Sequence, residues 1–188
     1  MNAKKMTTYQ LVLTALMTAV VCILGPWSLN IPISPVPISM GNLGILLAVA
    51  ILGTKYGTLS CVLYLLIGLI GLPVFSNFGS GIGKLAGPTG GYLIGYIPMV
   101  VVCGLVMSRF MGKAFRDRVM QALSMVLGTA VLYVFGTAWL AVVAGMTFGQ
   151  ALAAGVIPFI PGDLVKILIV VLLAPEIRSR LVKANLLA

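Results

Sequence analysis

Six long apolar runs dominate this sequence, and the basic residues gather in the short gaps between them. A helix needs roughly 20 consecutive apolar residues to cross the hydrocarbon core of a bilayer, and most of these runs approach that length. Only 8% of the residues are charged, whereas soluble domains carry about 25%. The sequence therefore predicts an all-α integral membrane protein, folded as a compact bundle of six transmembrane helices.

The predicted spans are bounded by glycine, proline or charged residues, which end or interrupt regular helix. A proline-rich loop, PWSLNIPISPVPIS, follows the first span, and a glycine-rich loop, PVFSNFGSGIGKLAGP, follows the third. The segment 145–161 fits either a short helix at the membrane surface or the first half of the sixth span. We expect a single domain over residues 1–188, with spans at approximately 7–25, 39–54, 56–72, 89–108, 119–144 and 162–180.

The basic residues predict how the chain is oriented. With six spans, ten of the twelve lysines and arginines fall on one side of the membrane. The positive-inside rule makes that side the cytoplasm, so both ends of the chain are predicted to be inside (N-in/C-in). The basic groups are short and flank apolar runs, so we do not expect nucleic-acid binding. The ten residues are Lys4, Lys5, Lys55, Arg109, Lys113, Arg116, Arg118, Arg178, Arg180 and Lys183.

Three charged residues are left over on the opposite, outer side: Lys84, Asp163 and Lys166. A charge within a membrane helix is costly, so it marks a candidate functional site. Asp163 and Lys166 are three residues apart and share one helix face, just after a Pro-Gly helix start. They form either an ion pair that stabilises the helix or the polar end of a ligand pocket that opens outward.

Aromatic and amide residues fall in the same outer loops. Trp27, Phe75, Asn77 and Tyr92 are among them. Trp and Tyr at these places are explained by anchoring at the membrane interface. They are explained equally by a pocket for a small, partly apolar solute, which needs apolar walls and a few polar groups.

Several functions lack the residues that they require. Histidine is absent, the three cysteines are far apart, and no ATPase motif is present, so we expect neither an enzyme nor a metal site. No Asp or Glu lies deep in a span, where ion-coupled carriers hold one, so any uphill transport would need a partner. Ala15 and Ala19 lie one helical turn apart, a spacing that lets another helix approach closely, although chance or packing inside the bundle explains such a pair in so alanine-rich a chain.

Four motifs in order resemble the BioY family, the biotin-specific substrate-binding (S) components of energy-coupling-factor (ECF) transporters. They are PVPIS at 35–39, GLPVF at 71–75, GPTGGYLIG at 87–95 and IPGDLVK at 160–166. The resemblance covers nearly the whole chain. Many relatives carry a glutamine after the PVP stretch where this sequence has Gly41, and Asn42 beside it can take over a ligand contact.

The resemblance implies a high-affinity biotin-binding subunit in the cell membrane. Its vitamin site is expected near the outer face, roofed by the loops after the first and third spans. The implied partners are one transmembrane coupling protein and two ATPase subunits, and Ala15 and Ala19 become the stripe that docks to them. A self-sufficient small-solute carrier or channel is the alternative, and uptake by this chain alone would indicate it.

Biotin matches the candidate residues chemically. Its ureido ring has two N–H donors and a carbonyl acceptor, which suit Asp163 and Lys166. Lys84 and Asn77 are expected near the carboxylate end or on the lid, and the two ends can be exchanged. The remaining expected contacts are Trp27, Phe75 and Tyr92 as apolar walls and Asn42 as a polar contact.

Overall fold

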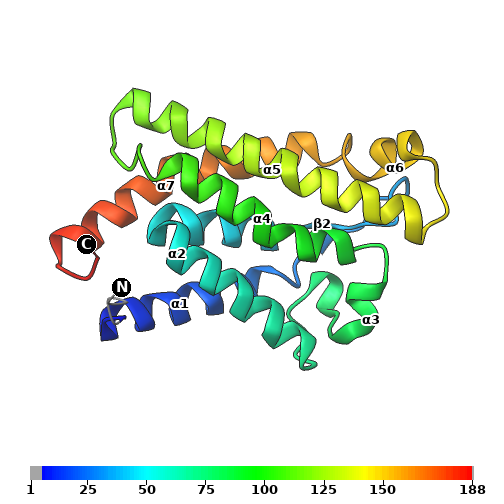
Figure 1. Cartoon of the computed structure of the whole chain (residues 1–188), viewed down its shortest axis with the longest axis horizontal. Coiled ribbons are helices and arrows are strands. Elements are labelled where there is room, and N and C mark those ends of the chain that lie inside the picture. Colours follow the sequence, from blue (N-terminus) through cyan, green and yellow to red (C-terminus); the bar gives the residue numbers. More distant parts are fainter. Residues whose placement is uncertain (1–5, 188) are drawn as a thin grey trace, which may run out of the picture.

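The computed structural model describes residues 6–187 and is an elongated helical bundle (Figure 1). Apart from two short strands and one 3-10 turn, the regular structure in this part of the chain is α-helical, as predicted. The strands pair antiparallel, with Ser28 opposite Ser39. The elements are α1 (Thr8–Leu24), β1 (Ser28–Leu29), β2 (Ile38–Ser39), α2 (Gly41–Leu69), η1 (Ser76–Phe78), α3 (Gly81–Ala86), α4 (Gly90–Met107), α5 (Phe115–Val143), α6 (Phe148–Gly155) and α7 (Ile160–Lys183).

By length and apolar composition, α2, α4 and α5 can each cross a membrane. Helices α6 and α7 form a bent pair, at 50°, that adds a fourth candidate span. Helix α1 is also apolar but only 17 residues long. The expectation of an all-α membrane protein is therefore confirmed, while the count of six spans stays a prediction.

Helix α2 contains two of the predicted spans, 39–54 and 56–72, because it is broken at Gly53. This residue has φ 81° and ψ 179°, a conformation open essentially to glycine alone. After the break the chain turns back on itself, and Gly57 packs against the backbone of Val49. The two halves of α2 therefore lie side by side, and the sequence located their boundary to within about two residues.

The segment 145–161 contains the short helix α6 and the bend that precedes α7. Thr147 and Gln150 form a capping box at the start of α6, which satisfies backbone N–H groups that the first turn leaves unpaired. Ala151 and Gly155 are the residues of α6 that face the core. Both sequence-based alternatives are thus partly right, because the segment is a separate short helix joined to the sixth predicted span.

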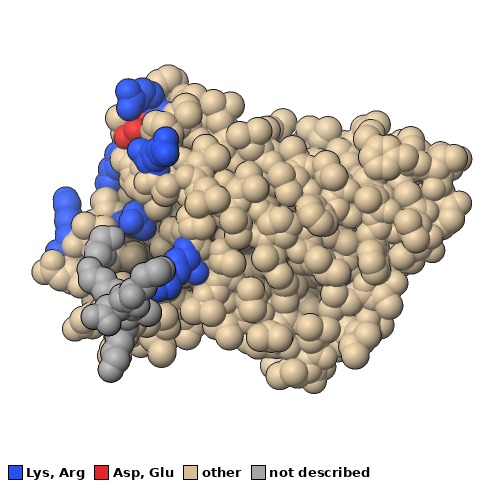
Figure 2. Space-filling model, viewed as in Figure 1, with Lys and Arg blue, Asp and Glu red and all other residues tan. Residues whose placement is uncertain are grey.

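The basic residues gather at the end of the bundle where α1 begins and α7 ends (Figures 1 and 2). There Glu176 accepts an ion pair from Lys113 at 2.6 Å and a longer one from Arg118. Arg178 donates to the carbonyl of Ile51, just before the break in α2. Helices α3 and α6 and strand β2 lie at the opposite end (Figure 1). Lys4 and Lys5, which also supported the predicted orientation, lie outside the described residues.

Helix α1 presents different faces to the bundle and to its surroundings. Thr14 and Thr18 are buried against α2, where Thr18 donates to Ser60 at 3.1 Å. Ala15 and Ala19 are exposed on a different face. Of the two sequence-based readings, close packing inside this bundle does not apply to these alanines.

Candidate ligand-binding site

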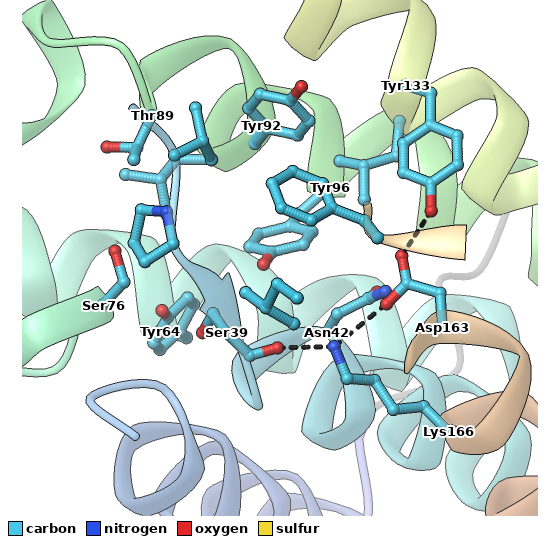
Figure 3. A pocket seen from close by; sticks show the side chains of 16 residues that line it. Ser39, Asn42, Tyr64, Ser76, Thr89, Tyr92, Tyr96, Tyr133, Asp163 and Lys166 are labelled. Atoms are coloured by element: carbon cyan, nitrogen blue, oxygen red, sulfur yellow. Dashed lines mark hydrogen bonds and ion pairs between the residues drawn. The ribbon is translucent and has the colours of Figure 1, made fainter. Parts of the chain in front are cut away.

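A pocket lies where the first turns of α2, α4 and α7 meet strand β2 (Figure 3). Its space, counted together with the mouth and the open solvent there, is about 540 Å³. Most of the walls are apolar or aromatic, with a few polar groups among them. The lining residues are Val36, Pro37, Ile38, Ser39, Asn42, Tyr64, Ser76, Thr89, Tyr92, Leu93, Tyr96, Leu132, Tyr133, Phe159, Asp163 and Lys166.

Asp163 and Lys166 form a buried ion pair in the pocket wall, with 2.9 Å between Oδ1 and Nζ. Both residues are nearly inaccessible, at 6% and 5% exposed. Pro161 stands in the first turn of α7, so Asp163 lies where the helix dipole favours a carboxylate. A buried charge is tolerated only when it is paired. Here Asp163 and Lys166 are each other's partner.

Two further elements hold this pair in place. The Tyr133 hydroxyl on α5 donates to Asp163 Oδ2 at 2.7 Å, and Lys166 donates to the carbonyl of Ser39 on β2 at 2.7 Å. Figure 3 shows these bonds converging from three sides of the pocket. The carboxylate can accept further hydrogen bonds and the ammonium has a third donor, so the pair can bind a ligand without being taken apart.

Asn42 adds an unused acceptor to the same wall. It is buried in the first turn of α2, and its Oδ1 has no hydrogen-bond partner among the described residues. Buried polar atoms without a partner are rare and call for an explanation. Because the side chain of Asn42 points into the pocket beside Asp163 (Figure 3), a ligand N–H group would satisfy this oxygen.

Tyrosine rings from α2 and α4 form much of the remaining wall. Tyr64 and Tyr96 are buried and line the pocket. Tyr92 also lines it, and its hydroxyl donates to the carbonyl of Gly155 at 2.7 Å. That bond ties α4 to α6 and leaves the ring of Tyr92 as an apolar surface for a ligand.

Sequence reasoning missed several residues of the pocket. Tyr96 lies four residues after Tyr92 on the same face of α4, and that spacing was a usable signal. Tyr64 and Tyr133 carry hydroxyl groups inside apolar spans, which is a weaker signal of a binding site. Nothing in the local pattern distinguishes Ser39, whose backbone carbonyl makes the contact.

Two of the expected apolar walls lie elsewhere in the structure. Phe75 is fully buried, at 0% exposed, and its ring meets that of Tyr64 edge to face at 5.5 Å between centroids. Trp27 is 63% exposed and stacks edge-on with Phe78 at 6.4 Å. Phe75 thus supports a lining residue from behind, and Trp27 lies in the loops outside the pocket.

Asn77 ties together the two loops that were expected to roof the site. Its backbone N–H donates to the carbonyl of Pro26 and to the hydroxyl of Ser28, at 3.1 and 2.9 Å. Its side chain accepts from Ser28 at 2.7 Å and donates to Asn30 at 2.8 Å. Asn77 adopts φ 56°, a left-handed conformation that asparagine tolerates better than most residues.

Lys84 lies on α3 and does not line the pocket. Its aliphatic chain covers Gly79, where an added Cβ would come within 2.6 Å of Lys84 Cε. The lysine is therefore held beside the η1 turn that carries Asn77. Of the eight expected ligand contacts, the structure brings together Asp163, Lys166, Asn42 and Tyr92 in one pocket.

The whole sequence has clear relatives. Residues 1–183 match the model of the BioY family. The protein named biotin transporter BioY from Rhizobium etli is 39% identical, over 89% of this chain and 92% of its own length. The biotin transporter BioY of Thermotoga maritima is 35% identical, over 90% of this chain and 96% of its own.

The fold also matches a solved structure. A crystal structure of the S-component for biotin from an ECF-type ABC transporter aligns with a TM-score of 0.85 and 30% sequence identity. The alignment covers 93% of this chain and 95% of that one. The agreement in fold therefore extends over most of the bundle.

Proposed function

The chain belongs to the BioY family and is a biotin S component of an ECF-type transporter, and we propose that it holds biotin in the pocket lined by Asp163 and Lys166. It is a multi-pass membrane protein that binds a substrate and is not an enzyme. The observation that carries the proposed site is the buried ion pair beside the unpartnered oxygen of Asn42. A buried oxygen without a partner is costly unless a polar ligand uses it.

The ureido ring of biotin is the part that this wall would recognise. Its two N–H groups would donate to the Asp163 carboxylate and to Asn42 Oδ1, and its carbonyl would accept from Lys166. Hydrogen bonds to charged groups contribute about 1.5–3 kcal/mol each. The thiophane ring and the methylene chain would then lie against the ring of Tyr92, supported by Tyr64 with Phe75 behind it.

The valerate carboxylate would lie toward the roof, where the chain of Lys84 covers Gly79 beside the η1 turn. Asn77 holds the roof together, and Trp27 packs on its outside. We propose that biotin enters when these loops part and that they close over its carboxylate end. The reverse placement, with the carboxylate on Lys166, is the alternative.

We further propose six spans with both ends in the cytoplasm, formed by α1, the two halves of α2, α4, α5, and α7 with α6. The break at Gly53 supports counting α2 twice, and the basic end of the bundle supports the orientation. In this arrangement the pocket mouth faces outward across the plasma membrane. Biotin would then be captured from outside the cell.

An energy-coupling module is implied by the ECF-type context, and we propose that it consists of one transmembrane coupling protein and two ATPase subunits. The exposed alanines Ala15 and Ala19 on α1 are the proposed docking stripe. Small residues spaced four apart allow another helix to approach closely. The module would supply the free energy to reorient the loaded chain.

Calorimetry on the purified full chain tests the proposed ligand and site together. Biotin should bind tightly, whereas thiamin and riboflavin should not. Asp163→Asn and Lys166→Ala should each weaken biotin binding by at least roughly tenfold, equivalent to about 1.4 kcal/mol. Unchanged affinity in both variants would rule out the site.

Two controls complete this test. Lys113→Ala breaks an exposed ion pair at the other end of the bundle and should leave biotin affinity unchanged, because exposed pairs contribute about 0–1 kcal/mol. Liposomes that contain the chain alone should bind biotin without accumulating it. Uptake there without partner or ATP would instead identify a self-sufficient carrier or channel.

A further inference from the structure

Tyr133 reaches the ligand pocket from the middle of α5 and contacts the residue on which biotin recognition would depend. Its hydroxyl donates to Asp163 Oδ2 at 2.7 Å, while Lys166 donates to Oδ1 at 2.9 Å. The two donors come from different helices and hold both oxygens of one carboxylate (Figure 3). Rotation of the Asp163 side chain would break at least one of these bonds, so the carboxylate is fixed in orientation before a ligand arrives.

Tyr133 also lies between the ligand pocket and a second groove, because it lines both. Tyr133 and Asp163 line a second groove, between α5 and α7, whose other lining residues are apolar except for one threonine. Val126 and Leu164 on its rim are 43% and 53% exposed, so the groove opens on the outer surface of the bundle. The Tyr133–Asp163 pair therefore separates the polar pocket from a surface that faces lipid. The groove is lined by Val126, Thr129, Ala130, Tyr133, Ile160, Asp163, Leu164 and Ile167.

We propose that Tyr133 is a positioning residue for biotin recognition, which it controls by orienting the Asp163 carboxylate toward the ureido N–H groups. This inference rests on the proposed function, in which Asp163 accepts from biotin. A preoriented acceptor gains affinity because less ordering is needed on binding. The same hydrogen bond keeps the carboxylate from turning into the apolar groove, where its charge would have no partner.

The role predicts an energetic coupling between the two residues. Tyr133→Phe keeps the ring and the wall and removes only the hydroxyl. We expect biotin to bind about tenfold more weakly, as for the loss of a hydrogen bond to a charged group. In an Asp163→Asn background the same change should weaken binding less than about threefold, because the acceptor there is neutral.

The matched control is Tyr56→Phe. Tyr56 also donates a short hydrogen bond, to Gln10 Oε1 at 2.6 Å, but it joins α2 to α1 away from the pocket. This variant should bind biotin with unchanged affinity. Unfolding temperatures without biotin, measured for every variant, identify any loss that comes from misfolding.

A second readout does not depend on affinity. The carboxylate stretching band of Asp163, identified by its absence in Asp163→Asn, should shift in Tyr133→Phe in infrared spectra of the protein without biotin. An unshifted band would overturn the proposal even if Tyr133→Phe were too unstable for calorimetry.

The outcomes separate this inference from the proposed function. Equal losses from Tyr133→Phe in both backgrounds would mean that Tyr133 acts independently of Asp163 and would overturn the inference. Normal affinity in Tyr133→Phe with weakened affinity in Asp163→Asn would do the same and leave the proposed site standing. Normal affinity in Asp163→Asn alone would overturn the inference, and normal affinity in both Asp163→Asn and Lys166→Ala would remove the proposed site with it.

Discussion

Gly57 packs so closely against Val49 that a Cβ at position 57 would lie 2.6 Å from the Val49 Cα. In an unbroken α-helix, which rises about 1.5 Å per residue, these residues would be ~12 Å apart along the axis. Their contact exists because Gly53 reverses the chain. The pocket depends on this reversal, since Asn42 precedes the break and Tyr64 follows it.

Gly57→Ala should therefore destabilise the bundle. The added methyl group meets backbone atoms, which cannot move aside as a flexible side chain would, and overpacking of this kind costs about 1–3 kcal/mol. We expect a lower unfolding temperature for the purified protein in detergent. Gly83→Ala is the matched control, because nothing lies within 4 Å of a Cβ there. Equal stability of the two variants would contradict the close packing of the two α2 segments.

Asn77 should control how long biotin stays bound. Asn77→Gly keeps the left-handed backbone but removes the side-chain bonds to Ser28 and Asn30, so the roof should open more often. We expect biotin to dissociate roughly threefold to tenfold faster, equivalent to about one net hydrogen bond. Stopped-flow displacement with excess unlabelled biotin measures this rate.

The control for this prediction is Asn185→Gly. Asn185 also has a positive φ, 55°, but lies beyond α7 at the opposite end of the bundle. Its substitution should leave the biotin dissociation rate unchanged. If Asn77→Gly instead weakened binding entirely through the association rate, Asn77 would not act as a latch on the bound state.

The sequence predicted the class of fold and singled out Asp163 and Lys166 as candidate ligand contacts. Apolar runs and clustered charges are dictated directly by the bilayer, so the helices, the break near Gly53 and the unusual pair Asp163 and Lys166 could all be read from the chain. Placing a charged side chain inside the bilayer costs free energy, so such residues can be identified as candidate functional residues without knowledge of the tertiary structure.

The rest of the pocket depends on packing, which sequence patterns do not encode. An aromatic residue in an outer loop is equally compatible with facing a ligand, lipid or the core, and Phe75 faces the core. Tyr133 lies 30 residues from Asp163 along the chain and becomes its partner only when α5 and α7 pack together. The carbonyl of Ser39 is a backbone group, and no residue type predicts its use.

The proposed orientation can be tested by labelling from either side of the membrane. In a variant whose three native cysteines are replaced by alanine, Ile82→Cys on α3 should react with a membrane-impermeant maleimide in intact cells. Arg116→Cys should react only after permeabilisation, because it lies at the basic end of the bundle. Ile82 is a suitable probe since it is 76% exposed. The opposite labelling pattern would invert the proposed topology and place the pocket mouth inside the cell.

The docking stripe on α1 should matter for transport and not for binding. Ala15 and Ala19 are exposed and lie roughly 100° around α1 from Thr14 and Thr18, which are buried against α2. Tryptophan at position 15 or 19 would hold a docking helix away, because close approach requires small side chains. We expect Ala15→Trp and Ala19→Trp to keep the biotin affinity of the isolated chain.

In cells that express the energy-coupling module, the same two variants should take up biotin at least roughly tenfold more slowly, equivalent to about 1.4 kcal/mol of docking free energy. Ala153→Trp is the matched control, since Ala153 is an exposed alanine on α6, and it should transport normally. Normal uptake by Ala15→Trp and Ala19→Trp would show that the module docks elsewhere. Loss of biotin binding in the isolated variants would show instead that α1 supports the pocket, in which case slow uptake would carry no information about docking.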